Sequence, residues 1–214
     1  MNTEKMDLLK EKREASFYVE KAHEDASWIP FLIETLENPT AIKYMAEKTL
    51  RVLSIEYPKD LFPYTDILFP YLKSDNHFIK WGLIITLANL LEKEGLWDRI
   101  KEEYYSFLDS KELVEFGNTV STLDKVIQKN QEEETYFVSL LCKTDTHTFL
   151  HKGEVSKECQ NVAIGHVLDF FTKIYSNSLY QKEIENFTKR QVNNPKESTR
   201  KKAVSLLKKI EKGQ

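Results

Sequence analysis

The residues of this sequence that are best suited to chemistry are two cysteines and two histidines in the second half of the chain. Cys142, His147, His151 and Cys159 are separated by four, three and seven residues. Two thiolates and two imidazoles could hold zinc in a tetrahedral site. Zinc sites usually contain more closely spaced cysteine pairs, however, and Cys142 continues the apolar face of the helix expected before it. We therefore favour a buried thiol and predict no metal site, and metal analysis of the purified protein would decide between the two.

No catalytic arrangement stands out elsewhere in the sequence. His23 and Glu24 begin the zinc-protease pattern HExxH, but Ser27 occupies the place of its second histidine. Neither common glycine-rich phosphate loop occurs. A nucleophilic cysteine would also need a group that stabilises an oxyanion, and none is apparent. We therefore predict a non-enzymatic protein with no catalytic residues and no cofactor.

Composition and charge favour a soluble globular chain. Of 214 residues, 41% are hydrophobic and 30% are charged, and the net charge of −3 provides no overall basic field for nucleic acid. Two cysteines and an N-terminus without an apolar signal region predict a cytoplasmic location. The longest uncharged run of the most apolar segment is too short to cross a bilayer, so we expect no membrane partner.

Helices are expected to position most of these residues, because apolar residues recur with helical periodicity and no stretch alternates long enough to predict a sheet. The segment 74–95 is apolar on nearly all sides and must be enclosed by neighbouring helices. Uninterrupted helices are expected over residues 60–73, with a kink at Pro70, over 111–129 and over 132–150, before a loop at 151–155. We predict a single domain over residues 1–214, with an N-terminal capping helix over 3–26 and helix pairs over 27–57, 58–95, 96–130, 131–177 and 178–212.

A ladder of apolar residues recurs in the second helix of each pair. In three copies a basic residue is followed by apolar residues at positions i+3, i+7 and i+10, and two looser copies keep only the apolar positions. An Asn-Pro turn precedes the first and the last copy, at Asn38 and Asn194. The full copies are Lys43, Ala46, Leu50, Leu53; Lys80, Leu83, Leu87, Leu90; and Arg200, Ala203, Leu207, Ile210, and the looser ones are Phe116, Val120, Leu123 and Ala163, Val167, Phe170.

This pattern resembles the HEAT-repeat and armadillo-type α-solenoid family. The best match is the segment 68–75 followed by Lys80, and the resemblance covers about residues 28–210. It implies an all-α fold, a right-handed α-α superhelix (a HEAT-like solenoid) of about five helix pairs plus an N-terminal helix, in which stacked pairs share one core. Because the family consists mostly of scaffolds and adaptors, it also implies a protein or peptide partner.

The partner is expected on the concave face, which the second helices line in this family. At about 100° per residue, positions −2, +1, +2 and +5 from a ladder residue lie opposite the core. Trp81 and Ile84 would supply the apolar anchor of a groove with a polar rim, although both could instead belong to the core. The predicted partner-binding residues are Tyr44, Glu47, Arg51, Trp81, Ile84, Ile85, Asn118, Ser121, Lys201 and Lys208.

A DNA-binding protein is the alternative function. Some DNA alkylation-repair glycosylases also consist of HEAT-like repeats, with tryptophans and an acid that line a basic groove. Trp97 and Asp98 are similar to that pairing, and residues 189–214 contain nine basic and two acidic residues, a net charge of +7. The remainder carries −10, which opposes DNA binding. This alternative predicts retention on a DNA column at low salt.

Overall fold

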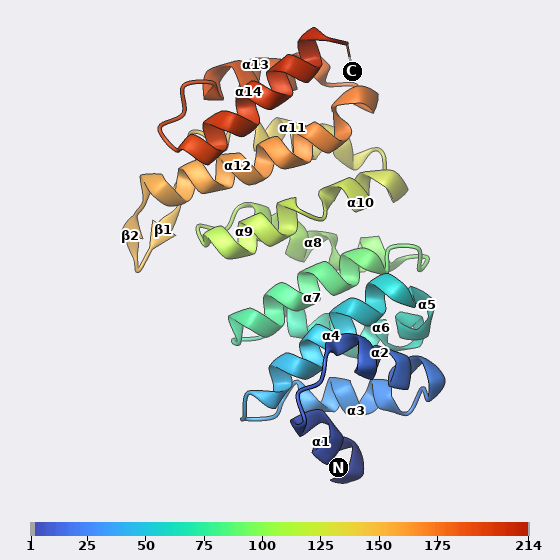
Figure 1. Cartoon of the computed structure of the whole chain (residues 1–214). Helices are drawn as coiled ribbons and strands as arrows, with labels where there is room; N and C mark the ends of the chain where they lie inside the picture. The colour runs from blue at the N-terminus through green and yellow to red at the C-terminus, as the bar shows by residue number, and fades with distance from the viewer. Residues whose placement is uncertain (1–2, 214) are drawn as a thin grey trace. The chain divides into compact units, whose positions relative to one another are not determined.

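The computed structural model describes residues 3–213, which contain fourteen α-helices, three 3-10 helices and one short β-hairpin. Backbone contacts divide the chain into two compact units, one up to Glu103 and one from Tyr104 onward. The boundary falls within α8 (Leu96–Leu108). Figure 1 shows the first unit in blue to green and the second in green to red. The single domain expected over 1–214 stays a prediction, and each unit is described by itself.

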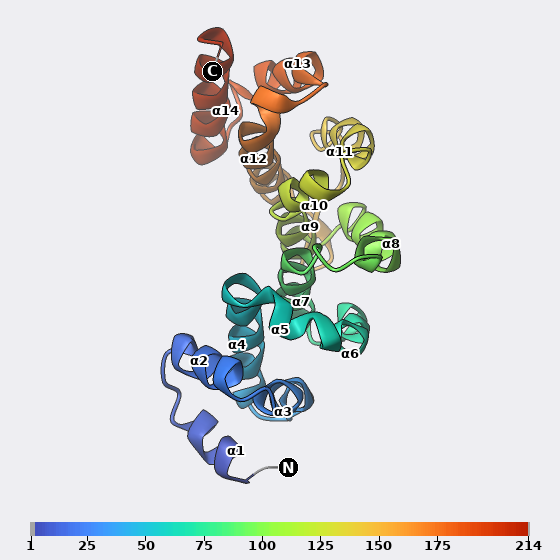
Figure 2. The same ribbon diagram turned by 90° about the vertical axis from the view of Figure 1, so that its right-hand side faces the viewer.

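In the first unit, α4 lies at the centre and packs against α2, α3 and α7 (Figure 2). The ladder residues of α4 and α7 are buried, as their spacing predicts. The elements are α1 (Thr3–Lys10), α2 (Ala15–Glu24), α3 (Trp28–Thr35), α4 (Ile42–Glu56), α5 (Pro58–Leu61), η1 (Phe62–Tyr64), α6 (Thr65–Leu68), η2 (Phe69–Lys73) and α7 (His77–Asn89).

In the second unit, α12 packs against both α9 and α14, and α13 covers α14. The two looser ladders are buried, but in α14 Leu206 is buried and Leu207 is only half-buried, so that helix is turned slightly from the predicted register. The elements are α9 (Leu113–Val120), α10 (Leu123–Lys129), α11 (Glu133–Leu141), β1 (Leu150–His151), β2 (Glu154–Val155), α12 (Lys157–Ile174), η3 (Tyr175–Asn177), α13 (Gln181–Gln191) and α14 (Glu197–Glu211).

The two Asn-Pro turns have the same geometry. Asn38 Oδ1 accepts a hydrogen bond from the backbone N–H of Thr40 at 2.9 Å, and Asn194 Oδ1 accepts one from the backbone N–H of Lys196 at 3.0 Å. These side chains replace backbone partners just before α4 and α14 begin. Arg200, the basic residue of the last ladder, donates to the carbonyl oxygen of Asn194 at 2.9 Å. The Asn-Pro turn is therefore a local motif in both copies, and in the last copy it also binds the basic residue of the ladder.

The N-terminal segment differs from the single helix expected over 3–26, because it forms α1 and α2. Lys12 has a positive φ of 52°, which cannot continue a right-handed helix. The hydroxyl of Tyr18 donates to the carbonyl oxygen of Leu8 at 3.0 Å and accepts from the N–H of Arg13 at 3.1 Å. One buried tyrosine therefore holds the link between the two helices.

Prolines divide the segment that was expected to form one kinked helix over 60–73. Pro58, Pro63 and Pro70 each lie at the first or second position of a new short element. A proline is accepted in a first turn but removes a hydrogen bond from a helix interior. The segment forms four short pieces, of which three have a proline at their first or second position and α6 begins at Thr65, so the prediction of a single kink is wrong.

Side-chain hydroxyls end α9 inside the helix expected over 111–129. Ser121 Oγ donates to the carbonyl oxygen of Asn118 and Thr122 Oγ1 donates to that of Thr119, both at 2.7 Å. Such local bonds compete with the helical backbone pattern. The chain turns at these two residues and resumes as α10.

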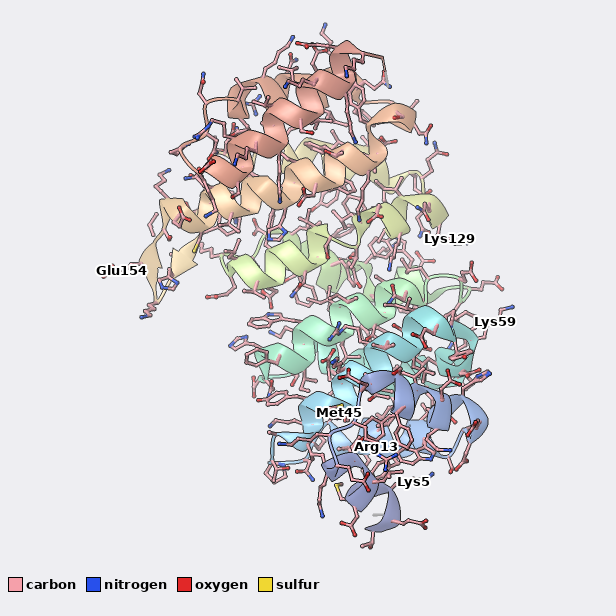
Figure 3. All side chains as sticks on the ribbon, in the orientation of Figure 1. Lys5, Arg13, Met45, Lys59, Lys129 and Glu154 are labelled. Carbon is pink, nitrogen blue, oxygen red and sulfur yellow. The ribbon has the colours of Figure 1, made fainter. Side chains whose placement is uncertain are left out.

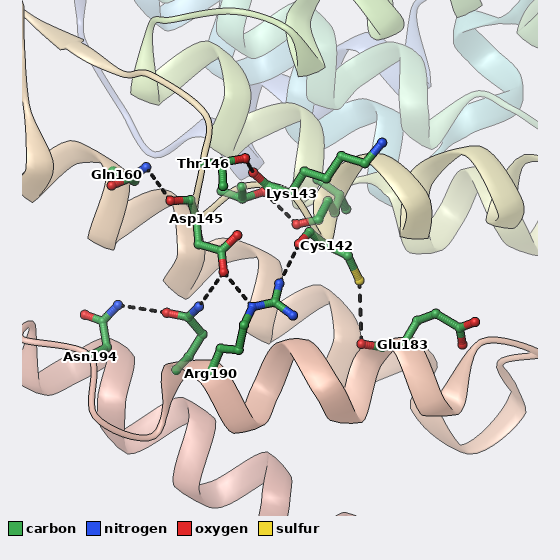
Figure 4. Close-up of polar contacts among 11 residues, drawn as sticks. Cys142, Lys143, Asp145, Thr146, Gln160, Glu183, Arg190 and Asn194 are labelled. Carbon is green, nitrogen blue, oxygen red and sulfur yellow. Dashed lines mark hydrogen bonds and ion pairs between the residues drawn. The ribbon is translucent and has the colours of Figure 1, made fainter.

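Long-range hydrogen bonds end α11 inside the helix expected over 132–150 (Figure 4). Arg190 donates to the carbonyl oxygen of Cys142 and to the carboxylate of Asp145, both at 2.8 Å. Gln160 donates to the carbonyl oxygens of Asp145 and His147 at 2.9 and 2.7 Å. Side chains of α12 and α13 thus satisfy the backbone that a longer helix would have used.

The segment 151–155, predicted as a loop, instead forms most of a β-hairpin, with the turn at residues 152–153. Lys152 and Gly153 at its tip both have positive φ, 53° and 84°, which is the conformation of the tight turns that suit twisted antiparallel strands. Leu150 pairs with Val155, and His151 pairs with Glu154. The hairpin is the only sheet among residues 3–213. Across the same residues, every helix is too short or too polar to span a lipid bilayer.

Candidate binding surface

The ten predicted partner-binding residues differ widely in exposure. In the first unit Tyr44 is exposed, Arg51, Trp81 and Ile85 are half-buried, and Glu47 and Ile84 are 8% and 0% exposed. In the second unit Asn118 is half-buried, whereas Ser121, Lys201 and Lys208 are exposed. The expectation that Glu47 and Ile84 face a partner is therefore corrected: both side chains are buried.

Glu47 is buried because it belongs to the contact between α4 and α7. It lies over Gly82 of α7, and a Cβ atom at that position would overlap its carboxylate. Glu47 Oε1 accepts a hydrogen bond from Arg51 Nε at 2.7 Å. Burial raises the pKa of Glu47, and the guanidinium of Arg51 opposes this shift. The glycine thus makes room for a charged side chain between two repeats.

Four aromatic side chains from α4 and the first turns of α7 form a connected group that we call the aromatic cluster: Tyr44, His77, Phe78 and Trp81. The ring centroids of Tyr44 and Phe78 are 5.6 Å apart, and those of Phe78 and Trp81 are 5.1 Å apart, both in edge-on geometry. His77 stacks on Trp81 at 5.8 Å. Phe78 is 63% exposed and Tyr44 is 39% exposed. The cluster is thus an apolar surface of rings that hold one another in place.

The start of α7 determines which rings are presented. Asn76 Oδ1 accepts a hydrogen bond from the N–H of Ile79 at 3.3 Å and caps the helix, so that His77 is its first residue. Phe78 and Trp81 are then three residues apart and lie on neighbouring parts of one face. Phe78 was missed in the sequence because the predicted stripe began at Trp81. Its spacing from Trp81 is the signal that could have identified it.

A pocket of about 710 Å³ adjoins the aromatic cluster. Tyr44 lines both, and Met45 of α4 lies in the pocket wall together with Met6 and Leu9 of α1. Figure 3 marks Met45 on α4, and Lys5 and Arg13 on the N-terminal segment with which α4 is in contact. The first unit therefore combines an exposed group of rings with an adjoining apolar hollow.

The cysteine and histidine residues are not brought together as a metal site. Cys142 Sγ donates to the carbonyl oxygen of Glu183 at 3.7 Å, and burial raises the pKa of its thiol to about 11. His147 Nε2 lies 3.1 Å from the carbonyl oxygen of Ser110, and its ring packs against two phenylalanines. No group of three or more potential metal ligands occurs in the part of the chain that the structure describes. A thiol with a raised pKa is also a poor nucleophile at neutral pH.

The residues that suggested DNA binding are mostly engaged within the chain. Trp97 is buried, and Asp98 pairs with Lys101 at 3.0 Å. Several cations of the basic C-terminal region are neutralised by carboxylates: Lys189 by Glu185, Arg190 by Asp145, Lys196 by Glu158, Lys201 by Glu197 and Lys202 by Asp169.

Two solved structures are similar to the chain in fold. The crystal structure of an engineered protein aligns with a TM-score of 0.54 at 17% identity, covering 97% of this chain and 88% of that chain. A designed armadillo repeat protein aligns with a TM-score of 0.53 at 15% identity, covering 89% and 84%. No family model matches the chain, and no curated protein matches its sequence. The chain thus has an all-α repeat fold of the armadillo and HEAT type, which confirms the fold class that the sequence predicts.

Proposed function

We propose that the chain is a non-enzymatic scaffold that binds a protein or peptide through the aromatic cluster of its first unit. The observation that carries this proposal is the exposure of Phe78 in direct contact with Tyr44 and Trp81. Aromatic residues dominate the energetics of protein interfaces, particularly where rings are already packed and lose little freedom on binding.

The second unit also has connected rings, in which Tyr136 packs against Tyr105 and Phe137 with centroids 4.6 and 6.0 Å apart. In that group Tyr136 is the one exposed ring, at 42%, whereas Phe78 and Tyr44 are both exposed in the aromatic cluster. Ile55 of α4 is 61% exposed and Ile67 of α6 is 49% exposed, but single exposed apolar side chains are normal on protein surfaces. Connected rings are different, because together they offer a partner a continuous apolar area with fixed geometry. The repeat fold supports the same role, since stacked helices present rigid surfaces for binding.

The proposal is tested by selecting binders from a phage-displayed library of random dodecapeptides on the full chain. Phe78→Ala should greatly reduce capture of the selected peptides, because it removes the most exposed ring. Ile55→Ala is the matched control, since it removes an equally exposed apolar side chain of the same unit and should leave capture unchanged. Equal capture by both variants and the wild type, or no enrichment at all, would refute the proposal.

The same preparation distinguishes the DNA-binding alternative. A scaffold that uses the aromatic cluster should pass through a duplex DNA column at low salt. Retention that weakens steeply with added salt would instead show contacts to phosphates and would favour the alternative.

A further inference from the structure

The pocket beside the aromatic cluster has an apolar floor. Met6 and Leu9 of α1 and Ile42 and Met45 of α4 line it. Two of the three methionines in the chain thus meet in one pocket. Methionine is flexible and polarizable, so that it adapts to apolar groups of different shape. At about 710 Å³ the pocket is large enough for more than one inserted side chain.

The rim of this pocket is cationic. Lys10, Lys12 and Lys48 line it, and no aspartate or glutamate does. Lys10 pairs with Asp7 at 2.8 Å. Lys12 and Lys48 form no ion pair with any residue between 3 and 213. Residues 1–103 contain nineteen acidic and fourteen basic residues, so a rim of lysines alone is a local reversal of the charge of this unit.

Two polar side chains at the pocket, Asn38 and Thr40, are hydrogen-bonded to each other. Asn38 Oδ1 accepts from both the N–H and the hydroxyl of Thr40, at 2.9 and 2.7 Å. The ammonium groups of Lys12 and Lys48 are the charged groups of the rim that remain for a ligand. A ligand that matches this site must carry apolar groups for the floor and negative charge for the rim.

We propose that the pocket between α1 and α4 binds an acidic amphipathic peptide, whose apolar side chains enter the pocket and whose carboxylates meet Lys12 and Lys48. This inference rests on the proposed function and adds the chemistry of the partner. A peptide is favoured over a single acyl chain because Tyr44 joins the pocket to the aromatic cluster. A peptide can cover both surfaces at once, whereas an acyl chain in the pocket would leave the rings exposed.

The composition of the peptides selected from the dodecapeptide library tests this inference. Enrichment of aspartate and glutamate next to leucine, methionine or aromatic residues is expected. The double variant Lys12→Glu with Lys48→Glu should lower the affinity for these peptides by about tenfold or more. A new selection on this variant should favour basic sequences. Lys59→Glu is the control, because Lys59 is exposed in the same unit away from the pocket.

A second variant tests the apolar floor. Ala41 is exposed at the pocket edge, so Ala41→Trp should fill the pocket without disturbing the core and should abolish binding. Circular dichroism and the midpoint of urea unfolding would verify that this variant remains folded. If it binds selected peptides as well as the wild type does, the pocket is not their site.

The outcomes separate this inference from the proposed function. The pocket proposal is wrong if the selected peptides require Phe78 but are not acidic, or if the variants at Lys12, Lys48 and Ala41 leave their binding unchanged. In either case the aromatic cluster remains a binding surface. Peptides that require none of these residues would overturn both. The pocket can also be tested with dodecanoate. If dodecanoate binds saturably, Ala41→Trp abolishes that binding, and the pocket variants leave peptide binding unchanged, then the pocket is a lipid site and the peptide proposal is wrong.

Discussion

The residue that follows the first apolar ladder residue is buried in α4 of the first unit but exposed in α14 of the second unit. Glu47 follows the ladder residue of α4 and is 8% exposed, because α7 packs over it with Gly82 beneath the carboxylate. Val204 follows the ladder residue of α14, the last helix that the structure describes, and is 37% exposed. A charged residue is thus buried where a hydrophobic one is exposed. Which side of a second helix is available depends on its neighbour rather than on its own residue types.

The surfaces that remain also differ in chemistry. The first unit presents the aromatic cluster and the lysine-rimmed pocket. On α14 the exposed residues are mostly charged or polar, and Lys201 and Lys202 are already paired with Glu197 and Asp169. Paired exposed charges contribute little to binding or stability. This difference is why we assign partner binding to the first unit.

The largest expected effect on stability comes from Gly82→Ala. The added Cβ would overlap the buried Glu47 carboxylate, which Arg51 holds in place. Overpacking of this kind costs about 1–3 kcal/mol, against a gain of about 1 kcal/mol in helix propensity. We expect a net loss in the free energy of unfolding, measured by urea denaturation.

Two further variants test whether the overlap with Glu47, rather than the Gly→Ala change itself, causes the loss of stability. In the double variant Gly82→Ala with Glu47→Ala the overlap disappears. Glu47→Ala should therefore lower the free energy of unfolding less in the Gly82→Ala background than in the wild type. In Gly165→Ala in α12, the new Cβ would lie 3.0 Å from the hydroxyl oxygen of Thr199 and at ordinary contact distance, 3.7 and 3.9 Å, from two atoms of Lys202. The steric cost of this Cβ and the gain in helix propensity from Gly165→Ala should nearly cancel. An equal loss for Gly82→Ala and Gly165→Ala would contradict this explanation.

The buried carboxylate of the first unit should make stability fall as pH rises. Because burial raises the pKa of Glu47 above the ordinary value of 4.5, the folded state binds the proton more tightly than the unfolded chain does. The stability that wild type gains over Glu47→Gln should therefore be largest below pH 4.5 and decline as pH rises through the folded pKa. Urea unfolding of both proteins across this range measures the difference. A difference that grows with pH would show that the Arg51 ion pair outweighs burial.

His166 in the second unit should give the opposite dependence. Burial, with a contribution from the nearby Lys202, lowers its pKa below 6.5. Its stabilising contribution relative to His166→Gln should be complete above pH 6.5 and should be lost as pH falls through the folded pKa. The same unfolding series provides the measurement, and a flat difference would mean that the imidazole remains solvated.

The smallest effect is expected at the exposed end of α14. Lys201 and Glu197 form an ion pair at 2.6 Å, but both side chains are mostly exposed. Lys201→Gln should change the free energy of unfolding by less than about 0.5 kcal/mol. A loss comparable with that of Gly82→Ala would show that this surface is packed in a way that the structure does not indicate.

Local and periodic features of the fold could be predicted from the sequence, whereas contacts between distant segments could not. The apolar ladder residues of the first two copies are buried because helical spacing alone places them on one face. They are Ala46, Leu50, Leu53, Leu83, Leu87 and Leu90. The early end of α11 depends on Gln160 and Arg190, which are distant in sequence. Burial of Glu47 depends on a glycine in the next second helix, and no periodicity encodes that contact.

The three tryptophans of the chain provide the most direct test of the aromatic cluster as a binding surface. Trp28 and Trp97 are buried, whereas Trp81 lies in the cluster. In nitrogen-15 correlation spectra, with Trp81→Phe used to assign its indole signal, a peptide selected on the chain should shift the Trp81 signal and leave those of Trp28 and Trp97 in place. A saturable binder that leaves the Trp81 signal unmoved would contradict the assignment of partner binding to this surface.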